Sequence, residues 1–333
     1  MQFRTLLRVM LLLVVAMFAT ASRATLPKFD TMFVFGDSLS DTGNVMLATR
    51  QQGLVPAIPP SDSPYATYYQ GRFSNGPVAV ESLWKAVSLN KLATVRPFLL
   101  DRSIPKRGAV NFAFGGAATG ASNATPGGFI VPGVLGQVGL FSAALGNKPA
   151  PANALYVVWA GGNDYGATGQ TSPGPVVANI AQAIRTLHAL GARKFLVPNL
   201  PDLGLSPMAQ AQGQGAALTQ LTKAHNNLLA QTLRNLSSSL HRVSIVQADI
   251  YKVGEVLVST GVVSVSPPAL EMIAPGTGAV DCLFRNTATC IDVPLDAPLP
   301  PVLFWDILHP TAQVHDVMAM TMYTRLLLSR ISD

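Results

Sequence analysis

Three side chains that could together activate a nucleophile lie near opposite ends of the chain. Ser38 stands in FGDSLSDTGN, while Asp306 and His309 stand three residues apart in FWDILHPT. A serine hydroxyl is a weak nucleophile until a base takes its proton and a third group orients that base. A separation of three residues allows the carboxylate and the imidazole to lie on one face of a turn and touch. We therefore predict Ser38 as the nucleophile, His309 as its base and Asp306 as the residue that orients the base.

Attack of such a serine on an ester carbonyl creates an oxyanion, which needs hydrogen-bond donors that are already in place. The candidates are the backbone N–H of Ser38, the backbone N–H of Gly116 in NFAFGGA and the side-chain amide of Asn163 in WAGGND. Glycine suits the second position because a backbone approaches a substrate closely only where no side chain intervenes. Gly115 is the alternative donor, and we choose Gly116 from its distance to Asn111 along the chain.

Short apolar runs and helical patterns alternate along the chain, and these elements must position the candidate residues. TMFVFGDS predicts a buried strand that ends in a turn, and similar runs recur at 109–113, 154–160, 194–198 and 243–247. Helical patterns are clearest at 176–190 and 218–236, and a final helix is expected over 310–329. The alternation predicts a parallel sheet with both faces covered by helices.

Sheets of this type bind ligands outside the carboxyl ends of their strands. The candidate residues fall where this rule expects them. Ser38 follows the first strand, the pair Gly115 and Gly116 follows the second, and Asn163 follows the third. The motifs and the expected architecture therefore point to one edge of the sheet as the site.

FGDSLSDTGN, NFAFGGA, GGND and DILHP resemble, in order and approximate spacing, the four sequence blocks of the GDSL/SGNH hydrolases, which are serine esterases and lipases. The resemblance covers residues 33–311 and looks most like the secreted bacterial lipase, phospholipase and haemolysin branch. It implies a three-layer α/β/α, flavodoxin-like fold and a reaction that needs no metal and no organic cofactor. The residues that match the family's nucleophile, oxyanion donors and Asp-x-x-His pair are Ser38, Gly116, Asn163, Asp306 and His309.

Several functions use this set of residues. A lipase or phospholipase is the first expectation and a carbohydrate acetylesterase the second, while acyl transfer to another alcohol differs only in the group that receives the acyl chain. The alternative from another class is a secreted binding protein that has kept the fold and lost turnover. GDSLS departs from the G-x-S-x-G motif because Ser40 replaces the second glycine, which argues against an ordinary α/β-hydrolase.

Residues 1–24 have the parts of a secretory signal peptide. Arg4 and Arg8 precede an apolar run over 10–18, and small residues follow it. The alternative is a membrane anchor, but the run is shorter than the about 20 residues that cross a bilayer. We predict cleavage after Ala21 or Ala24 and a secreted or periplasmic protein, with residues 25–333 forming a single domain.

Composition and charge limit the partners. The chain is 49% apolar and 12% charged, which allows a large core and argues against disorder. Removal of residues 1–21 takes away Arg4 and Arg8 and lowers the formal charge from +6 to +4. Lysine and arginine form no run longer than two, so a nucleic-acid partner is not expected, whereas transient contact with an anionic membrane surface is compatible with the charge. The oligomeric state stays open.

The two cysteines, Cys282 and Cys290, lie eight positions apart. In an exported protein such a pair most simply forms a local disulfide, and two free thiols are the alternative. Metal binding needs more ligands than two cysteines. Both belong to residues 259–301, a stretch rich in Pro, Gly, Val and Ala that we predict to be an insertion forming a flap beside the site.

Overall fold

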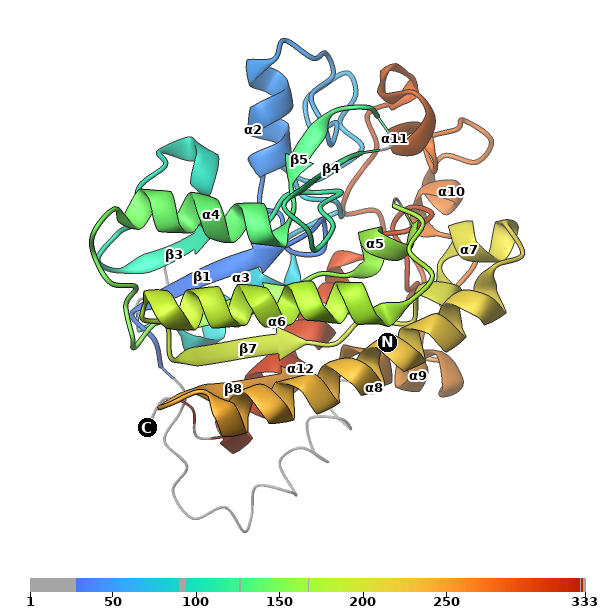
Figure 1. Ribbon diagram of the computed structural model, residues 1–333. Helices are drawn as coiled ribbons and strands as arrows, with labels where there is room; N and C mark the ends of the chain where they lie inside the picture. Colours follow the sequence, from blue (N-terminus) through green and yellow to red (C-terminus); the bar gives the residue numbers. More distant parts are fainter. Residues whose placement is uncertain (1–27, 90–93, 126, 167, 330, 332–333) are drawn as a thin grey trace.

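The computed structural model describes residues 28–89, 94–125, 127–166, 168–329 and 331 (Figure 1). The predicted signal peptide, 1–24, lies outside the described residues. A parallel sheet of six strands in the order β2-β3-β1-β6-β7-β8 forms the centre. Its strands are β1 Thr31–Gly36, β2 Val95–Pro97, β3 Gly108–Asn111, β6 Leu155–Trp159, β7 Lys194–Pro198 and β8 Ser244–Ala248. Without β2 this is the 2-1-3-4-5 order of flavodoxin-like folds, so the predicted fold class is confirmed.

Strand β1 lies at the centre of the sheet and is buried over its whole length. Successive side chains of a strand point to opposite faces. Accordingly Met32 and Val34 belong to one hydrophobic core, and Phe33 and Phe35 belong to the other. A continuous apolar run is what a parallel strand covered on both faces requires.

Helices cover the two faces in separate layers (Figure 1). The core that contains Phe33 is closed by α4 Val134–Leu145, α6 Pro173–Leu190 and α8 Gly215–Ser239. The core that contains Met32 is closed by α3 Ala79–Val87, α9 Ile250–Ser259 and α12 Ala312–Ser329. The predicted helices over 176–190 and 218–236 fall within α6 and α8. Helix α12 starts at Ala312 rather than at Pro310, because Pro310 pairs with Phe304 in an isolated bridge.

Short elements gather at the carboxyl edge of the sheet (Figure 1). They are α2 Asn44–Gln51, η1 Phe98–Leu100, the hairpin of β4 Ser122–Ala124 and β5 Ile130–Pro132, α5 Gly162–Gly166, η2 Leu203–Leu205 and α7 Pro207–Ala211. Among the described residues, no helix combines the length and apolar character that crossing a membrane requires.

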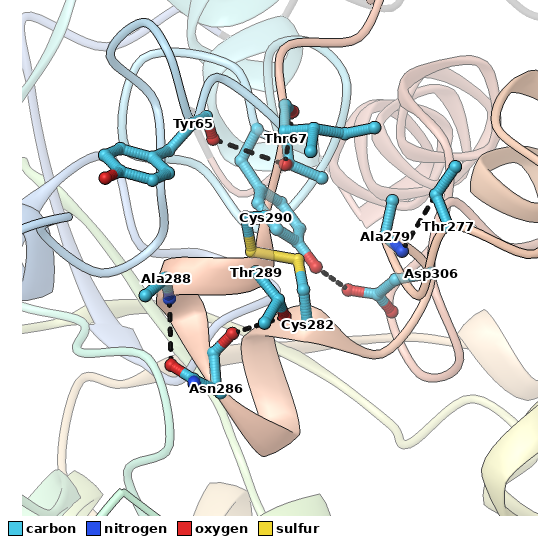
Figure 2. Close-up of a disulfide and its surroundings, with 12 residues drawn as sticks. Tyr65, Thr67, Thr277, Ala279, Cys282, Asn286, Ala288, Thr289, Cys290 and Asp306 are labelled. Carbon is cyan, nitrogen blue, oxygen red and sulfur yellow. Dashed lines mark hydrogen bonds between the residues drawn. A yellow bond between two sulfur atoms is a disulfide. The ribbon is translucent and has the colours of Figure 1, made fainter.

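The segment predicted as an insertion, 259–301, begins with the last residue of α9 and then contains only short helices. These are α10 Ala269–Ile273, α11 Cys282–Arg285 and η3 Thr287–Thr289. A disulfide joins Cys282 to Cys290, with 5.2 Å between their Cα atoms (Figure 2). The segment has a small hydrophobic core of its own, which includes Trp305 and Tyr68 from outside it. It is therefore packed against the chain next to Asp306.

Candidate active site

All five predicted site residues lie at the carboxyl edge of the sheet. Ser38 follows β1, Gly116 follows β3, and Asn163 stands in α5 shortly after β6. Asp306 and His309 stand in the loop before α12. Except for Asp306, which is fully buried, they line one cavity of about 270 Å³.

His309 lies between the predicted nucleophile and the predicted orienting carboxylate. Its Nε2 is 3.0 Å from Ser38 Oγ, and its Nδ1 is 2.7 Å from Asp306 Oδ2. All three residues are buried, and His309 is 4% exposed. The short Nδ1 contact favours the tautomer with a proton on Nδ1, which leaves the Nε2 lone pair facing the hydroxyl. The arrangement can move a proton from Ser38 to His309.

The turn that carries Asp306 is fixed by its own backbone. Asp306 Oδ1 accepts hydrogen bonds from the backbone N–H groups of Leu308, at 2.7 Å, and His309, at 2.6 Å. A carboxylate that accepts the N–H groups two and three residues further on stabilises a tight turn, so the DILH sequence folds locally into the geometry that the pair needs. The spacing of three residues was therefore sufficient to predict their contact.

Tyr68 belongs to the same constellation, although no sequence motif singled it out. Its hydroxyl donates a 2.7 Å hydrogen bond to Asp306 Oδ2, across a separation of 238 residues. The side chain is 1% exposed. Burial raises the pKa of Tyr68 well above its ordinary value, and the charge of Asp306 and the hydrogen bond to it raise it further. Tyr68 therefore keeps its proton and donates to Asp306 as a neutral hydroxyl.

The two glycines after β3 have different roles. The N–H of Gly115 donates to Asp41 Oδ2 at 2.9 Å, so it is not available to an oxyanion. Gly116 has φ +79°, a left-handed conformation that favours glycine, and it lines the cavity. A side chain at Gly115 would meet the ring of Phe73 at 2.2 Å. Gly115 is therefore held by packing and hydrogen bonding, and Gly116 is the better candidate donor.

Asn163 is oriented by a hydrogen bond to the same loop. Its Nδ2 donates to the carbonyl oxygen of Ala117 at 3.1 Å. A primary amide carries two N–H bonds, so this contact fixes the group while the second N–H is the candidate donor. The neighbouring Asp164 accepts from the backbone N–H and the hydroxyl of Thr119, at 2.9 and 2.7 Å, which ties α5 to the loop after β3.

A buried polar network joins the loops after β1 and β3. Asn44 Nδ2 donates to the carbonyl oxygens of Asn111 and Ala113, each at 2.8 Å, and Asn111 Nδ2 donates to Thr42 Oγ1 at 3.1 Å. Asp41 accepts four backbone N–H groups, those of Gly43, Asn44, Val45 and Gly115. Burial raises the pKa of Asp41 to about 6, although these donors oppose the shift. The network fixes Ser38 relative to Gly116.

Asp37 is a second buried carboxyl beside the nucleophile. Its Oδ1 accepts the backbone N–H of Leu39 at 3.1 Å, which supports the turn around Ser38. Burial raises the pKa of Asp37 to about 7, while the hydrogen bond from Leu39 and the charge of His309 lower it. Asp37 lines the cavity but lies outside the chain of contacts from Ser38 to Asp306.

Apolar side chains form most of the cavity surface. Two aromatic rings contact the imidazole of His309: Phe73 at 5.2 Å and Phe284 at 5.9 Å between ring centroids. Among the described residues, no group of three or more His, Cys, Asp or Glu side chains could hold a metal ion.

The chain matches a known protein family. The family model of the GDSL-like Lipase/Acylhydrolase matches residues 32–322. A GDSL esterase/lipase of Arabidopsis thaliana is 30% identical over 314 residues, covering 85% of this chain and 82% of that protein. A phosphatidylcholine-sterol acyltransferase of Aeromonas hydrophila is 32% identical over 217 residues, covering 63% of this chain and 56% of that protein. The match thus spans little more than half of the acyltransferase.

Among solved structures, a carbohydrate acetylesterase from Sinorhizobium meliloti has a TM-score of 0.44 and 11% identity, covering 89% of this chain and 97% of that one.

The resemblance inferred from the four motifs is confirmed by the family match over nearly the whole described chain. The protein belongs to the GDSL-like lipase/acylhydrolase family and is a hydrolase of carboxylic esters.

Proposed function

We propose that this protein is a secreted serine esterase that cleaves acyl esters of lipids through an acyl-enzyme. The single observation that carries the proposal is the chain of contacts from Ser38 Oγ through His309 to Asp306, at 3.0 and 2.7 Å. These distances match those of an activated nucleophile, its base and the group that orients the base.

In the first half of the reaction His309 Nε2 takes the proton of Ser38, and Oγ attacks the ester carbonyl. The N–H groups of Ser38 and Gly116 and the amide of Asn163 stabilise the oxyanion. The carbon–oxygen bond to the alcohol breaks, and His309 returns the proton to the departing alcohol. In the second half water gives a proton to His309 and attacks the acyl carbon. The bond between the acyl carbon and Ser38 Oγ then breaks, the carboxylic acid leaves, and His309 returns the proton to Oγ.

Asp306 and Tyr68 act on the imidazole rather than on the substrate. The carboxylate holds the proton on Nδ1 and stabilises the imidazolium that forms in each half-reaction. Tyr68 donates to the same carboxylate oxygen, so it limits rotation of the carboxylate. We regard Tyr68 as a positioning residue.

The character of the cavity supports a lipid acyl ester as the substrate. Apolar atoms form most of its surface, and leucine, phenylalanine, isoleucine, valine and methionine supply about half of its lining residues. Recognition of a sugar would require several polar side chains that converge on hydroxyl groups. An acetylated carbohydrate is the second candidate, and acyl transfer to an alcohol other than water is compatible with the same residues.

Export is also part of the proposal. The signal-peptide pattern of residues 1–24 supports it, and the disulfide between Cys282 and Cys290 suits an oxidising compartment such as the periplasm or the medium. The apolar cavity and the mild positive charge support transient contact with a membrane surface during turnover.

The experiment compares wild type with Ser38→Ala on p-nitrophenyl acetate, butyrate, octanoate and palmitate, and on phosphatidylcholine. We expect turnover by wild type and its loss in Ser38→Ala, with a fluorophosphonate labelling wild type at Ser38. Ser40→Ala, which removes a neighbouring buried hydroxyl, is the matched control and should keep its activity. Equal turnover by wild type and Ser38→Ala would refute the nucleophile assignment.

An added alcohol acceptor separates hydrolysis from transfer. Formation of a new ester, measured with and without the alcohol, would assign transferase activity. Absence of turnover and of labelling in wild type would instead favour a binding protein that has the fold without the activity.

A further inference from the structure

We propose that the loop closed by the Cys282–Cys290 disulfide forms one wall of an acyl-chain subsite, in which Leu283 and Phe284 select longer acyl esters over acetyl esters. The inference rests on the proposed function, because it assumes that Ser38 receives the acyl group. It adds the part of the substrate that is recognised and the residues that recognise it.

The two side chains lie between the bridged cysteines and reach the catalytic cavity. Both Leu283 and Phe284 belong to α11, are half-buried and line the cavity that contains Ser38. The Phe284 ring is nearly parallel to the imidazole of His309, with an interplanar angle of 15°. A substrate bound to Ser38 therefore meets this loop next to the base.

Leu283 continues an apolar wall that other segments contribute. It packs with a hydrophobic cluster that contains Val45 from α2, Phe73, and the partly buried Ile58 and Phe129. All five line the cavity. Phe73 contacts His309 as well, so the wall begins at the imidazole and extends away from it. Side chains that are far apart in the sequence thus form one continuous apolar surface.

Hydrogen bonds hold the segment after the disulfide loop against the residues that precede Tyr68. Figure 2 shows the disulfide near Thr67, whose hydroxyl donates to the carbonyl oxygen of Ile291 at 2.8 Å. The backbone N–H of Ala66 donates to Asp292 Oδ1 at 2.7 Å. Because Tyr68 follows these contacts and binds Asp306, the wall and the catalytic residues share one support.

The size and chemistry of the cavity indicate what the wall binds. Its volume of about 270 Å³ is slightly below the range of about 300–1,000 Å³ of ligand pockets, which suits one acyl chain better than a whole diacyl lipid. Each methylene that enters an apolar site adds about fourfold to binding in the transition state. An acetyl group is too short to reach along such a wall, so only longer chains gain from it.

The test measures kcat/KM of wild type, Phe284→Ala and Leu283→Ala on two substrate series. The first varies the acyl chain of p-nitrophenyl esters from acetate to octanoate, and the second varies the alcohol of acetate esters from ethyl to octyl. Arg285→Ala, in the same helix with its side chain 80% exposed, is the matched control. Phe284→Leu tests whether an apolar side chain restores the selectivity.

We expect the ratio of octanoate to acetate turnover to fall about tenfold or more in Phe284→Ala, with less effect on acetate itself. Leu283→Ala should lower the ratio in the same direction, and Phe284→Leu should restore part of it. Arg285→Ala should leave the ratio unchanged. None of the variants should alter how kcat/KM depends on the length of the alcohol. The pair Cys282→Ser and Cys290→Ser, which frees the loop without altering the wall residues, should also lower the ratio.

Three results would overturn the subsite. They are an unchanged ratio, an equal loss on all acyl esters, and a change confined to the alcohol series. The last would assign the wall to the leaving alcohol. Acetate turnover by wild type keeps the two proposals apart: if wild type hydrolyses acetate, a failed ratio refutes only the subsite, whereas absence of any turnover by wild type refutes the function on which the subsite depends.

Discussion

The hydroxyl of Tyr68 and Nδ1 of His309 meet the same oxygen of Asp306, each at 2.7 Å. The other carboxylate oxygen accepts two backbone N–H groups of the tight turn. The carboxylate is therefore held on both oxygens, and Tyr68 supplies the one donor that comes from a distant part of the chain.

Tyr68→Phe removes this donor and keeps the ring. Hydrogen bonds to charged groups contribute about 1.5–3 kcal/mol, so we expect kcat/KM to fall by roughly tenfold to a hundredfold. The loss should fall on kcat rather than on KM, because Tyr68 orients the carboxylate that holds His309 and does not touch the substrate. Tyr69→Phe is the control, and an unchanged kcat would contradict the assignment.

Asn163→Ala removes the proposed side-chain donor to the oxyanion. Deletion of one such donor lowers kcat by about 10²–10³-fold, and KM should change little because the oxyanion exists only after attack. Asn163→Asp, which keeps the size but replaces the amide by a carboxylate, should be at least as damaging. Steady-state kinetics on p-nitrophenyl butyrate measure both constants. A loss confined to KM would place Asn163 in ground-state binding instead.

Asp41→Asn disrupts the loop that carries Ser38. The amide nitrogen of asparagine would face the N–H groups of Val45 and Gly115, which now donate to Asp41 Oδ2. Two buried donors without an acceptor cost roughly 2–6 kcal/mol, so the free energy of unfolding should fall by that amount. Activity should fall too, because the N–H of Gly115 loses its acceptor and the next residue, Gly116, is the proposed oxyanion donor. Urea unfolding measures the first effect, and the exposed Asp30→Asn, which should leave both properties unchanged, is the control.

His225→Asn reports on a buried histidine outside the reaction. His225 is fully buried in α8, and its Nδ1 is 2.7 Å from the hydroxyl of Tyr165. Burial lowers the pKa of His225 from 6.5 to about 4. The unfolded chain thus binds the proton more tightly. Burial of neutral His225 therefore makes its full contribution to the free energy of unfolding above about pH 6.5, and this contribution is lost as the pH falls toward 4.

At about 1.4 kcal/mol for each unit of pKa, wild type should lose roughly 3 kcal/mol more stability than His225→Asn over that interval. Asparagine can still meet the Tyr165 hydroxyl, so the fold should be kept. Urea unfolding at pH 4.5 and pH 7 measures the difference, with His241→Asn as an exposed control. Parallel pH dependences of wild type and His225→Asn would show that His225 does not titrate as described.

Local patterns were sufficient to predict much of the fold. The continuous apolar runs at 154–160 and 194–198 match β6 and β7, and the helical spacing of 218–236 lies within α8. Helix α4 was missed because apolar and small residues lie all round it, and such a helix shows no polar face in the sequence. Helix α3 is only nine residues long, which is too short for its period to stand out.

The sequence by itself determined the chemical groups of the candidate site, because Ser38, Gly116 and Asn163 each follow a strand, and Asp306 and His309 stand three positions apart in one tight turn. Strand endings and tight turns are local properties, so residue types and spacing reveal them.

Only the tertiary structure decided what surrounds these groups. Tyr68 reaches Asp306 across 238 residues, and Phe284 stacks on His309 from a disulfide loop that has no regular period. Neither contact can be predicted from the local sequence, because each depends on how loops pack at the carboxyl edge of the sheet. Long-range packing therefore sets the support of the carboxylate and the wall of the cavity, while the sequence motifs set the chemistry.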